Sequence, residues 1–214
     1  MSKNPNHMRP PSPWSVPGVP SSSHLVITEI RGMPFTPDEE LDLAFDPSLI
    51  SPDVKSKMPP DLHIRPLAST DYHRGYLTLL SVLTTTPDPG EAAFVAQFNA
   101  MRETPRTYFP IVVVSKASDR IIANGTLFIE RKFAHNTASV GHLEEGVVAE
   151  DYQGKKLGPR VFQALTYVSE SLGCYKTILN CSDKNVRFYE NCGMVKKGNE
   201  MVKYAPERTH TPKL

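Results

Sequence analysis

An apolar stripe at helical spacing runs through residues 157–172 and limits the folds open to this chain. Leucine and valine recur there every three or four residues; the apolar members are Leu157, Val161, Leu165, Val168 and Leu172. This spacing puts them all on one face of an α-helix, and such a face is buried against other elements. Gly173 follows the stripe and is typical of a residue that ends a helix. We therefore predict a long helix over 157–172.

Short β-type segments lie on both sides of this helix. Runs of apolar and β-branched residues predict strands at 62–67, 107–116, 121–133, 139–149, 175–181 and 199–204. Helical spacing predicts further helices at about 71–83, 91–102 and 185–193. This order of elements predicts an α+β fold with three layers (α/β/α), in which helices cover both faces of a mixed central sheet.

The N-terminal part is organised differently, because proline is frequent there. Residues 1–22 combine proline with Ser and Asn and are expected to be disordered, while 24–30 could form a short strand. Residues 34–60 are expected to form an extended arm that wraps the domain, anchored by Phe45, Leu49 and Ile50. We expect a proline-rich extension at 1–44, a folded domain at 45–206 and a polar tail at 207–214.

Composition excludes several classes of protein. The 214 residues are 39% hydrophobic and carry a net charge of +1, so no basic face for nucleic acid is expected. No window reaches the ~18 apolar residues of a membrane span, and the N-terminus lacks the apolar region of a signal peptide. A cytoplasmic protein is the expectation. Cys174, Cys181 and Cys192 are odd in number and lack metal-ligand spacing, so buried reduced thiols are expected.

A polar loop precedes the long helix and has the character of an anion site. It consists of Gln153, Gly154, Lys155, Lys156, Leu157 and Gly158. Free N–H groups and the helix dipole favour anions at a helix N-terminus. The two glycines let the backbone approach a phosphate, and the two lysines add positive charge. Taken alone, the loop fits either a phosphate site or a solvated turn.

Neighbouring segments extend this loop into a family pattern. QGKKLG resembles the Q/R-x-x-G-x-G/A pyrophosphate loop of the GNAT acetyltransferase superfamily, with Lys156 where the first glycine usually stands. The other segments are ERKFAH (130–135), GHLEE (141–145), GCYKTILNCSDKNVRFYENCG (173–193) and NEMVKY (199–204). In this order and spacing they closely resemble eukaryotic glucosamine-6-phosphate N-acetyltransferases. FDPSLISP (45–52) and IRPL (64–67) resemble the fungal branch, and the resemblance covers about 45–206.

The resemblance implies a GNAT domain in which acetyl-CoA lies between two splayed parallel strands, with no metal. The implied acetyl-CoA contacts are Gly146, Val147, Val148, the loop residues Gln153, Gly154, Lys155, Lys156, Leu157 and Gly158, and Asn185, Phe188 and Tyr189. Glu144 and Glu145 would position the amine of glucosamine 6-phosphate and help to accept its proton, and Tyr189 would stabilise the departing thiolate. Transfer would be direct, giving N-acetylglucosamine 6-phosphate for UDP-N-acetylglucosamine synthesis.

The resemblance also implies a sugar site shared by two chains. Its implied members are Thr84, Lys132, Phe133, Ala134, His135, Glu144, Glu145, Asn180 and Tyr204. The family is a homodimer whose C-terminal strand is exchanged between chains, so we expect a second copy of this chain as partner. Lys132 is the natural partner of the sugar phosphate.

Several positions depart from the family pattern. Asn180 and Glu145 stand where the family has aspartate, residues 146–148 replace Ile-Ala-Val, and Pro159 follows the loop. Gly146 can tolerate the bulge that its strand needs. Two alternatives therefore stay open: a GNAT enzyme for a different amine, and a divergent protein that binds acyl-CoA without significant turnover.

Overall fold

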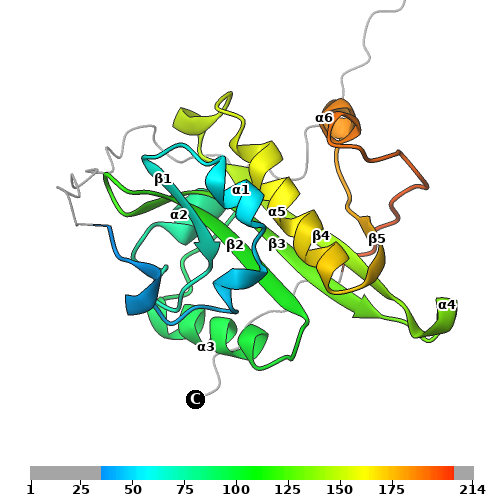
Figure 1. Cartoon of the computed structure of the whole chain (residues 1–214), viewed down its shortest axis with the longest axis horizontal. Coiled ribbons are helices and arrows are strands. Elements are labelled where there is room, and N and C mark those ends of the chain that lie inside the picture. Colours follow the sequence, from blue (N-terminus) through cyan, green and yellow to red (C-terminus); the bar gives the residue numbers. More distant parts are fainter. Residues whose placement is uncertain (1–34, 205–214) are drawn as a thin grey trace, which may run out of the picture. The chain divides into compact units, whose positions relative to one another are not determined.

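The centre of the molecule is a five-stranded mixed sheet (Figure 1), and the computed structural model describes residues 35–204. The strands are β1 (Leu62–Pro66), β2 (Tyr108–Ser115), β3 (Arg120–Arg131), β4 (Ser139–Val148) and β5 (Cys174–Ile178). They lie in sequence order across the sheet, antiparallel except for the parallel pair β4 and β5. The predicted α+β fold and these five predicted strands are confirmed, to within a few residues at their ends.

Short and long helices connect and cover the strands. They are η1 (Asp38–Glu40), η2 (Pro47–Leu49), α1 (Pro52–Ser56), α2 (Tyr76–Leu80), α3 (Glu91–Arg102), α4 (Ala134–Thr137), η3 (Glu150–Tyr152), α5 (Leu157–Ser171), η4 (Asp183–Asn185) and α6 (Val186–Asn191). The predicted helices at 91–102 and 157–172 are confirmed. Turns and α2 replace the helix predicted over 71–83, because Gly75 has a left-handed φ of 81° that a continuous helix cannot include.

The predicted strand at 199–204 was wrong for the single chain. Residues 195–204 have no regular secondary structure, although they are described. An extended segment becomes a strand only when a neighbour pairs with its N–H and C=O groups. Within residues 35–204 no strand pairs with this segment.

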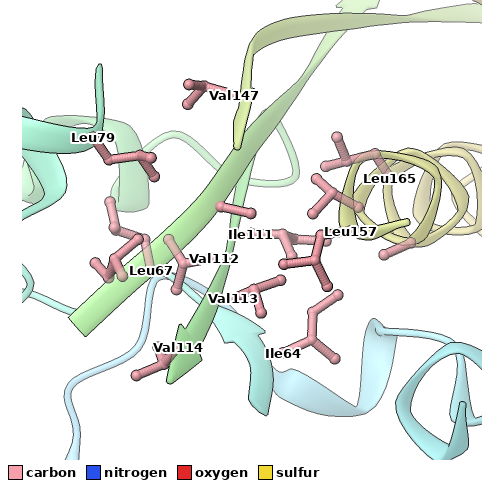
Figure 2. Packing of buried hydrophobic residues seen from close by; sticks show 14 of the residues in the cluster. Ile64, Leu67, Leu79, Ile111, Val112, Val113, Val114, Val147, Leu157 and Leu165 are labelled. Carbon is pink, nitrogen blue, oxygen red and sulfur yellow. The ribbon is translucent and has the colours of Figure 1, made fainter. Parts of the chain in front are cut away.

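The apolar face of α5 packs on one side of the sheet, and α2 covers the other. Figure 2 shows Ile111 and Val113 pointing toward Leu157 and Leu165 of α5, while Val112 and Val114 lie on the opposite side of the strand, the side of Leu67. All of the predicted α5 stripe is buried except Leu172, which is half-buried at the helix end. A fully buried leucine or valine contributes about 1.5–3 kcal/mol, so this face fixes α5 on the sheet.

Two glycines let α5 approach the sheet closely. A Cβ at Gly125 of β3 would lie 2.8 Å from Leu165 and 2.9 Å from Val161. A Cβ at Gly141 of β4 would lie 2.3 Å from Ser169 Oγ. Both distances are shorter than real Cβ contacts, so the position of α5 over β3 and β4 requires glycine at these two sites.

The arm before β1 is folded rather than extended. Residues 35–60 form η1, η2 and α1, with Ser51 accepting a hydrogen bond from Val54 N as the N-cap of α1. The expected anchors contact the core. Ile50 is buried in it and Leu49 packs against the core cluster. The rings of Phe45 and Phe109 lie with their centroids 5.2 Å apart. The frequent prolines of this segment led to the prediction of an extended arm. Pro52, however, is the first residue of α1, a position that suits proline. The predictions for 1–22, 24–30 and 207–214 lie outside the described residues.

Two further expectations concern cysteine and the membrane. Cys174, Cys181 and Cys192 are free thiols, but Cys181 is exposed and the other two are only half-buried, so the expected full burial was wrong. Among residues 35–204 no helix combines the length and apolarity needed to cross a bilayer.

A buried ion pair joins β1 to the turn that leads into α2. Both nitrogens of the Arg65 guanidinium fork donate to Asp71 at 2.8 Å, and these side chains are only 1% and 0% exposed. Asp71 also accepts from Ala68 N at 2.7 Å. Arg74 extends the network to Asp119, donating to it at 2.8 Å. Such a pair is costly to break, because removing one partner leaves a buried charge without compensation.

We predict that Asp71→Ala lowers the free energy of unfolding by about 3–5 kcal/mol, measured by urea denaturation. The matched control is Asp183→Ala, which removes the partner of Lys196 in an exposed pair with side chains 94% and 61% exposed. Exposed pairs contribute at most about 1 kcal/mol. Equal losses for the two variants would mean that the Arg65 pair does not hold the β1–α2 corner together.

Candidate active site

The site begins where β4 and β5 part. Their parallel pairing extends from Ser139 with Cys174 to His142 with Ile178 and then ends. β4 continues to Val148, so from Leu143 onward its β5-facing edge has no strand partner among residues 35–204. Backbone N–H and C=O groups on such an edge are available to a ligand. This is the splayed pair of strands that the resemblance implies.

A bulge in β4 lies at the same place. Asn124 pairs with Val147 and Thr126 pairs with Glu144, so Gly125 alone faces the two residues Glu145 and Gly146. The left-handed residue of the bulge is Glu145, with φ 54°. Gly146 lies in the bulge, as expected, but the left-handed position falls on Glu145, and a glutamate there carries conformational strain that a glycine would avoid.

A cavity of about 550 Å³ opens between the parted strands. It brings together twelve predicted site residues: Glu144, Gly146, Val147, Val148, Gln153, Gly154, Lys156, Leu157, Gly158, Asn185, Phe188 and Tyr189. Predicted Lys155 is not among the lining residues, and its ammonium lies 4.2 Å from the centre of the Tyr152 ring.

Sequence reasoning missed eight lining residues: Asn124, Leu143, Tyr152, Pro159, Val161, Phe162, Leu165 and Leu179. Val161 and Leu165 belong to the predicted apolar stripe, whose first turns line the cavity as well as the core. Asn124 had no signal in the sequence, because its role depends on pairing between β3 and β4.

The loop before α5 has the geometry of an anion site. Gly154 and Lys156 have left-handed φ values of 77° and 61°, so the chain turns sharply before the helix begins at Leu157. Gln153 Nε2 donates to Val148 O at 3.3 Å and ties the loop to the end of β4. A Cβ at Gly158 would lie 3.3 Å from the Phe188 ring, so glycine lets α6 approach the loop. The first N–H groups of α5 therefore border the cavity.

Tyr189 lies across the cavity from the β4 bulge. Its hydroxyl oxygen would be 4.0 Å from a Cβ at Gly146. The ring is half-buried and held by Phe188 and Phe162, with centroids 4.9 and 6.0 Å away. Burial, and then the nearby Cys181 and Cys192, raise the pKa of Tyr189 above its usual value. The hydroxyl stays protonated at neutral pH and can donate a proton or hydrogen bond into the cavity.

Glu144 and Glu145 lie at the bulge with different surroundings. Both are exposed, but of the two only Glu144 lines the cavity. Glu145 accepts long hydrogen bonds of 3.4 Å from Tyr76 and Thr126, and its backbone carbonyl accepts from Asn124 Nδ2 at 3.2 Å. Two carboxylates thus lie beside the unpaired edge of β4, where they can hold a cationic or amine ligand.

The remaining predicted residues are not brought to this cavity within one chain. Lys132, Phe133, Ala134 and His135 lie at or beside α4, at the far tip of the β3–β4 hairpin (Figure 1). The pair of β3 and β4 residues nearest this tip is Arg131 with Ser139. Ser139 is five residues before Glu144 in β4, which corresponds to about 17 Å along a strand. Lys132 donates to Glu130 at 2.6 Å, and His135 stacks on Tyr175 at 4.7 Å. Thr84, Asn180 and Tyr204 are exposed.

No group of three or more His, Cys, Asp or Glu side chains in residues 35–204 could hold a metal ion.

Comparison with known proteins matches this geometry to a family. The acetyltransferase (GNAT) family profile matches residues 73–194. Glucosamine 6-phosphate N-acetyltransferase 1 from Dictyostelium discoideum is 41% identical over 68% of this chain and 92% of its own length. The Candida albicans glucosamine 6-phosphate N-acetyltransferase is 42% identical over 68% and 97%. The crystal structure of the Arabidopsis thaliana enzyme superposes with a TM-score of 0.66 at 38% identity, covering 67% of this chain and 97% of that one.

We predict that Lys156→Gly gives a higher free energy of unfolding than Lys155→Gly, by about 1 kcal/mol. Both changes remove one lysine charge and add the same flexibility to the unfolded chain, but only Lys156 has a left-handed φ. Chemical denaturation of the two variants measures the difference. Equal stabilities would mean that the loop relaxes and stores no strain at Lys156.

Proposed function

The chain belongs to the GNAT acetyltransferase family, and we propose that it transfers the acetyl group of acetyl-CoA to the 2-amine of glucosamine 6-phosphate. The observation that carries the proposal is the cavity between β4 and β5. The loop 153–158, which has the geometry of an anion site, lines this cavity, and so does Tyr189, whose hydroxyl faces the β4 bulge. The relatives' names give the acceptor. The product, N-acetylglucosamine 6-phosphate, would enter UDP-N-acetylglucosamine synthesis in the cytoplasm.

The residues around the cavity suit an acyl-CoA. The pyrophosphate would meet the N–H groups of 153–158 and the charge of Lys156. Apolar Val161, Phe162 and Phe188 suit the pantetheine chain, and the free edge of β4 offers backbone partners to its amides. Asn185 lines the same cavity. The group bound would be a co-substrate that supplies the acetyl thioester.

Direct transfer needs a neutral amine and a stabilised leaving group. The amine nitrogen bonds to the thioester carbon, the C–S bond breaks, and the nitrogen loses a proton. Glu144 and Glu145 would orient the amine and help to take that proton. The Tyr189 hydroxyl, protonated because burial raises its pKa, would donate to the departing sulfur.

A second copy of the chain would complete the sugar site. Lys132 and His135 lie too far from Glu144 in one chain to hold the same small sugar phosphate. Large apolar side chains are exposed near them and in the C-terminal segment: Phe133, Tyr175, Ile178, Val195, Met201, Val202 and Tyr204. Such exposure is unusual for a surface that faces water only. We infer a homodimer in which the unpaired residues 199–204 find their strand partner in the other chain.

Asn180 favours one alternative, an enzyme of this fold that acts on a different amine. It is exposed, and its side chain contacts Glu200 only at 3.5 Å. An amide here keeps the shape of the family's aspartate but loses the charge, and a lost charged hydrogen bond matters by about 1.5–3 kcal/mol. The other alternative is acyl-CoA binding without turnover.

The deciding experiment follows the release of free CoA from acetyl-CoA. Release with glucosamine 6-phosphate, and none with a panel of other amines, is the expected result. Release with other amines only would support the different-amine enzyme. Tight acetyl-CoA binding with no release for any amine would contradict enzymatic function and leave a binding protein.

We predict that Tyr189→Phe lowers kcat by about ten- to a hundredfold and leaves the affinity for acetyl-CoA nearly unchanged. The ring, which packs against Phe162 and Phe188, is kept, and only the proton donor is lost. Steady-state kinetics and calorimetric titration with acetyl-CoA separate the two quantities. Tyr167→Phe, a change to an exposed tyrosine outside the cavity, is the control. An unchanged kcat would remove Tyr189 from the leaving-group role.

A further inference from the structure

Glu145 is held at both ends by side chains from other elements. Its backbone carbonyl accepts from Asn124 of β3, and its carboxylate accepts from Tyr76 of α2 and Thr126 of β3. Glu145 also occupies the one left-handed position of the β4 bulge. A strained residue keeps one conformation only where its surroundings fix it.

The two carboxylate contacts converge on a single oxygen. Both Tyr76 Oη and Thr126 Oγ1 donate to Oε2 of Glu145 at 3.4 Å. Among the described residues, Oε1 has no hydrogen-bond partner. One oxygen is therefore engaged by the protein while the other is free to accept a hydrogen bond from a ligand.

Tyr76 is a buried donor. It is only 6% exposed, and its ring packs against Phe94 with centroids 5.7 Å apart. Burial, followed by the neighbouring Glu145, raises the pKa of Tyr76 far above its usual value, so its hydroxyl remains a donor at any physiological pH. The hydroxyl of Tyr76 thus links a fixed aromatic ring in α2 to the flexible side chain of Glu145.

We propose that Tyr76 is a positioning residue of the acceptor site, whose hydroxyl fixes one oxygen of Glu145 and leaves the other to accept from the acceptor amine. The inference rests on the proposed acetyl transfer. It also gives a role to the longer side chain at position 145, where the resemblance implies aspartate. A glutamate can reach Tyr76 with its extra methylene, and this contact fixes one oxygen of the carboxylate on the side of α2.

The experiment measures acetyl transfer to glucosamine 6-phosphate by four proteins: the unchanged chain, Tyr76→Phe, Glu145→Asp and the double variant. Tyr76→Phe keeps the buried ring and removes only the hydroxyl. We expect kcat to fall about three- to tenfold, because one hydrogen bond typically contributes that much. The KM for acetyl-CoA should stay unchanged. Aspartate at 145 is one methylene too short for the contact, so in that background Tyr76→Phe should change kcat by less than about 1.5-fold.

Tyr72→Phe is the matched control. Tyr72 also donates to a carboxylate, Asp88 at 2.9 Å, but on the exposed side of the same turn. This variant should leave kcat unchanged. Urea denaturation of all variants checks that each is folded under the assay conditions.

Three outcomes are decisive against the idea or its premise. Unchanged kcat in Tyr76→Phe, with an active unchanged chain, would overturn the positioning role alone. Equal losses in the glutamate and aspartate backgrounds would mean that the hydroxyl acts through packing and not through Glu145, which also overturns it. No turnover by the unchanged chain would overturn the proposed function, and this inference would fall with it.

Discussion

The parting of β4 and β5 is the constraint on which the site depends. The two strands pair only from Ser139 with Cys174 to His142 with Ile178, and the bulge at Glu145 and Gly146 lies just beyond this pairing in β4. α5 lies directly over β3 and β4, where Gly125 and Gly141 leave no room for a Cβ. The helix cannot move to follow either strand. The gap between the strands therefore stays open, and the N-terminus of α5 stays beside it.

The open edge has a cost that other contacts offset. A bulged strand loses ladder hydrogen bonds, and a left-handed glutamate adds strain of about 1–3 kcal/mol. Asn124 replaces one lost partner by donating to the carbonyl of Glu145, although its own Oδ1 is buried without a partner within residues 35–204. Four valine and isoleucine residues of β2 are fully buried in the core. Burial of this kind stabilises the fold and offsets the free-energy cost of the strained bulge.

Sequence reasoning succeeded where structure is decided locally and failed where it is decided by distant partners. The stripe from Leu157 to Val168 fixed both the existence and the face of α5, since helical spacing needs no knowledge of the sheet. The start of the helix predicted over 71–83 could not be found from spacing, because the left-handed backbone of Gly75 delays the helix until Tyr76. Asn124 gave no signal at all, and Tyr76 gave only that of a position at helical spacing in the predicted helix. Their roles follow from strand register and from a helix that crosses the sheet 69 residues before Glu145 in sequence.

The departures from the family pattern fall into two groups, according to whether contacts within the chain accommodate the changed residue. Lys156 keeps the left-handed conformation that glycine would adopt more easily, so the loop retains its shape. Pro159 lies in the first turn of α5, where its missing N–H breaks no helical hydrogen bond and removes only a potential donor to a ligand. Glu145 reaches contacts within its own chain. Asn180 differs from all three, because its one side-chain contact, to Glu200, is long and exposed. The first three changes are accommodated by the fold, whereas in the proposed function the change at 180 would remove a charge from the acceptor site, and the choice of amine would then depend on that residue.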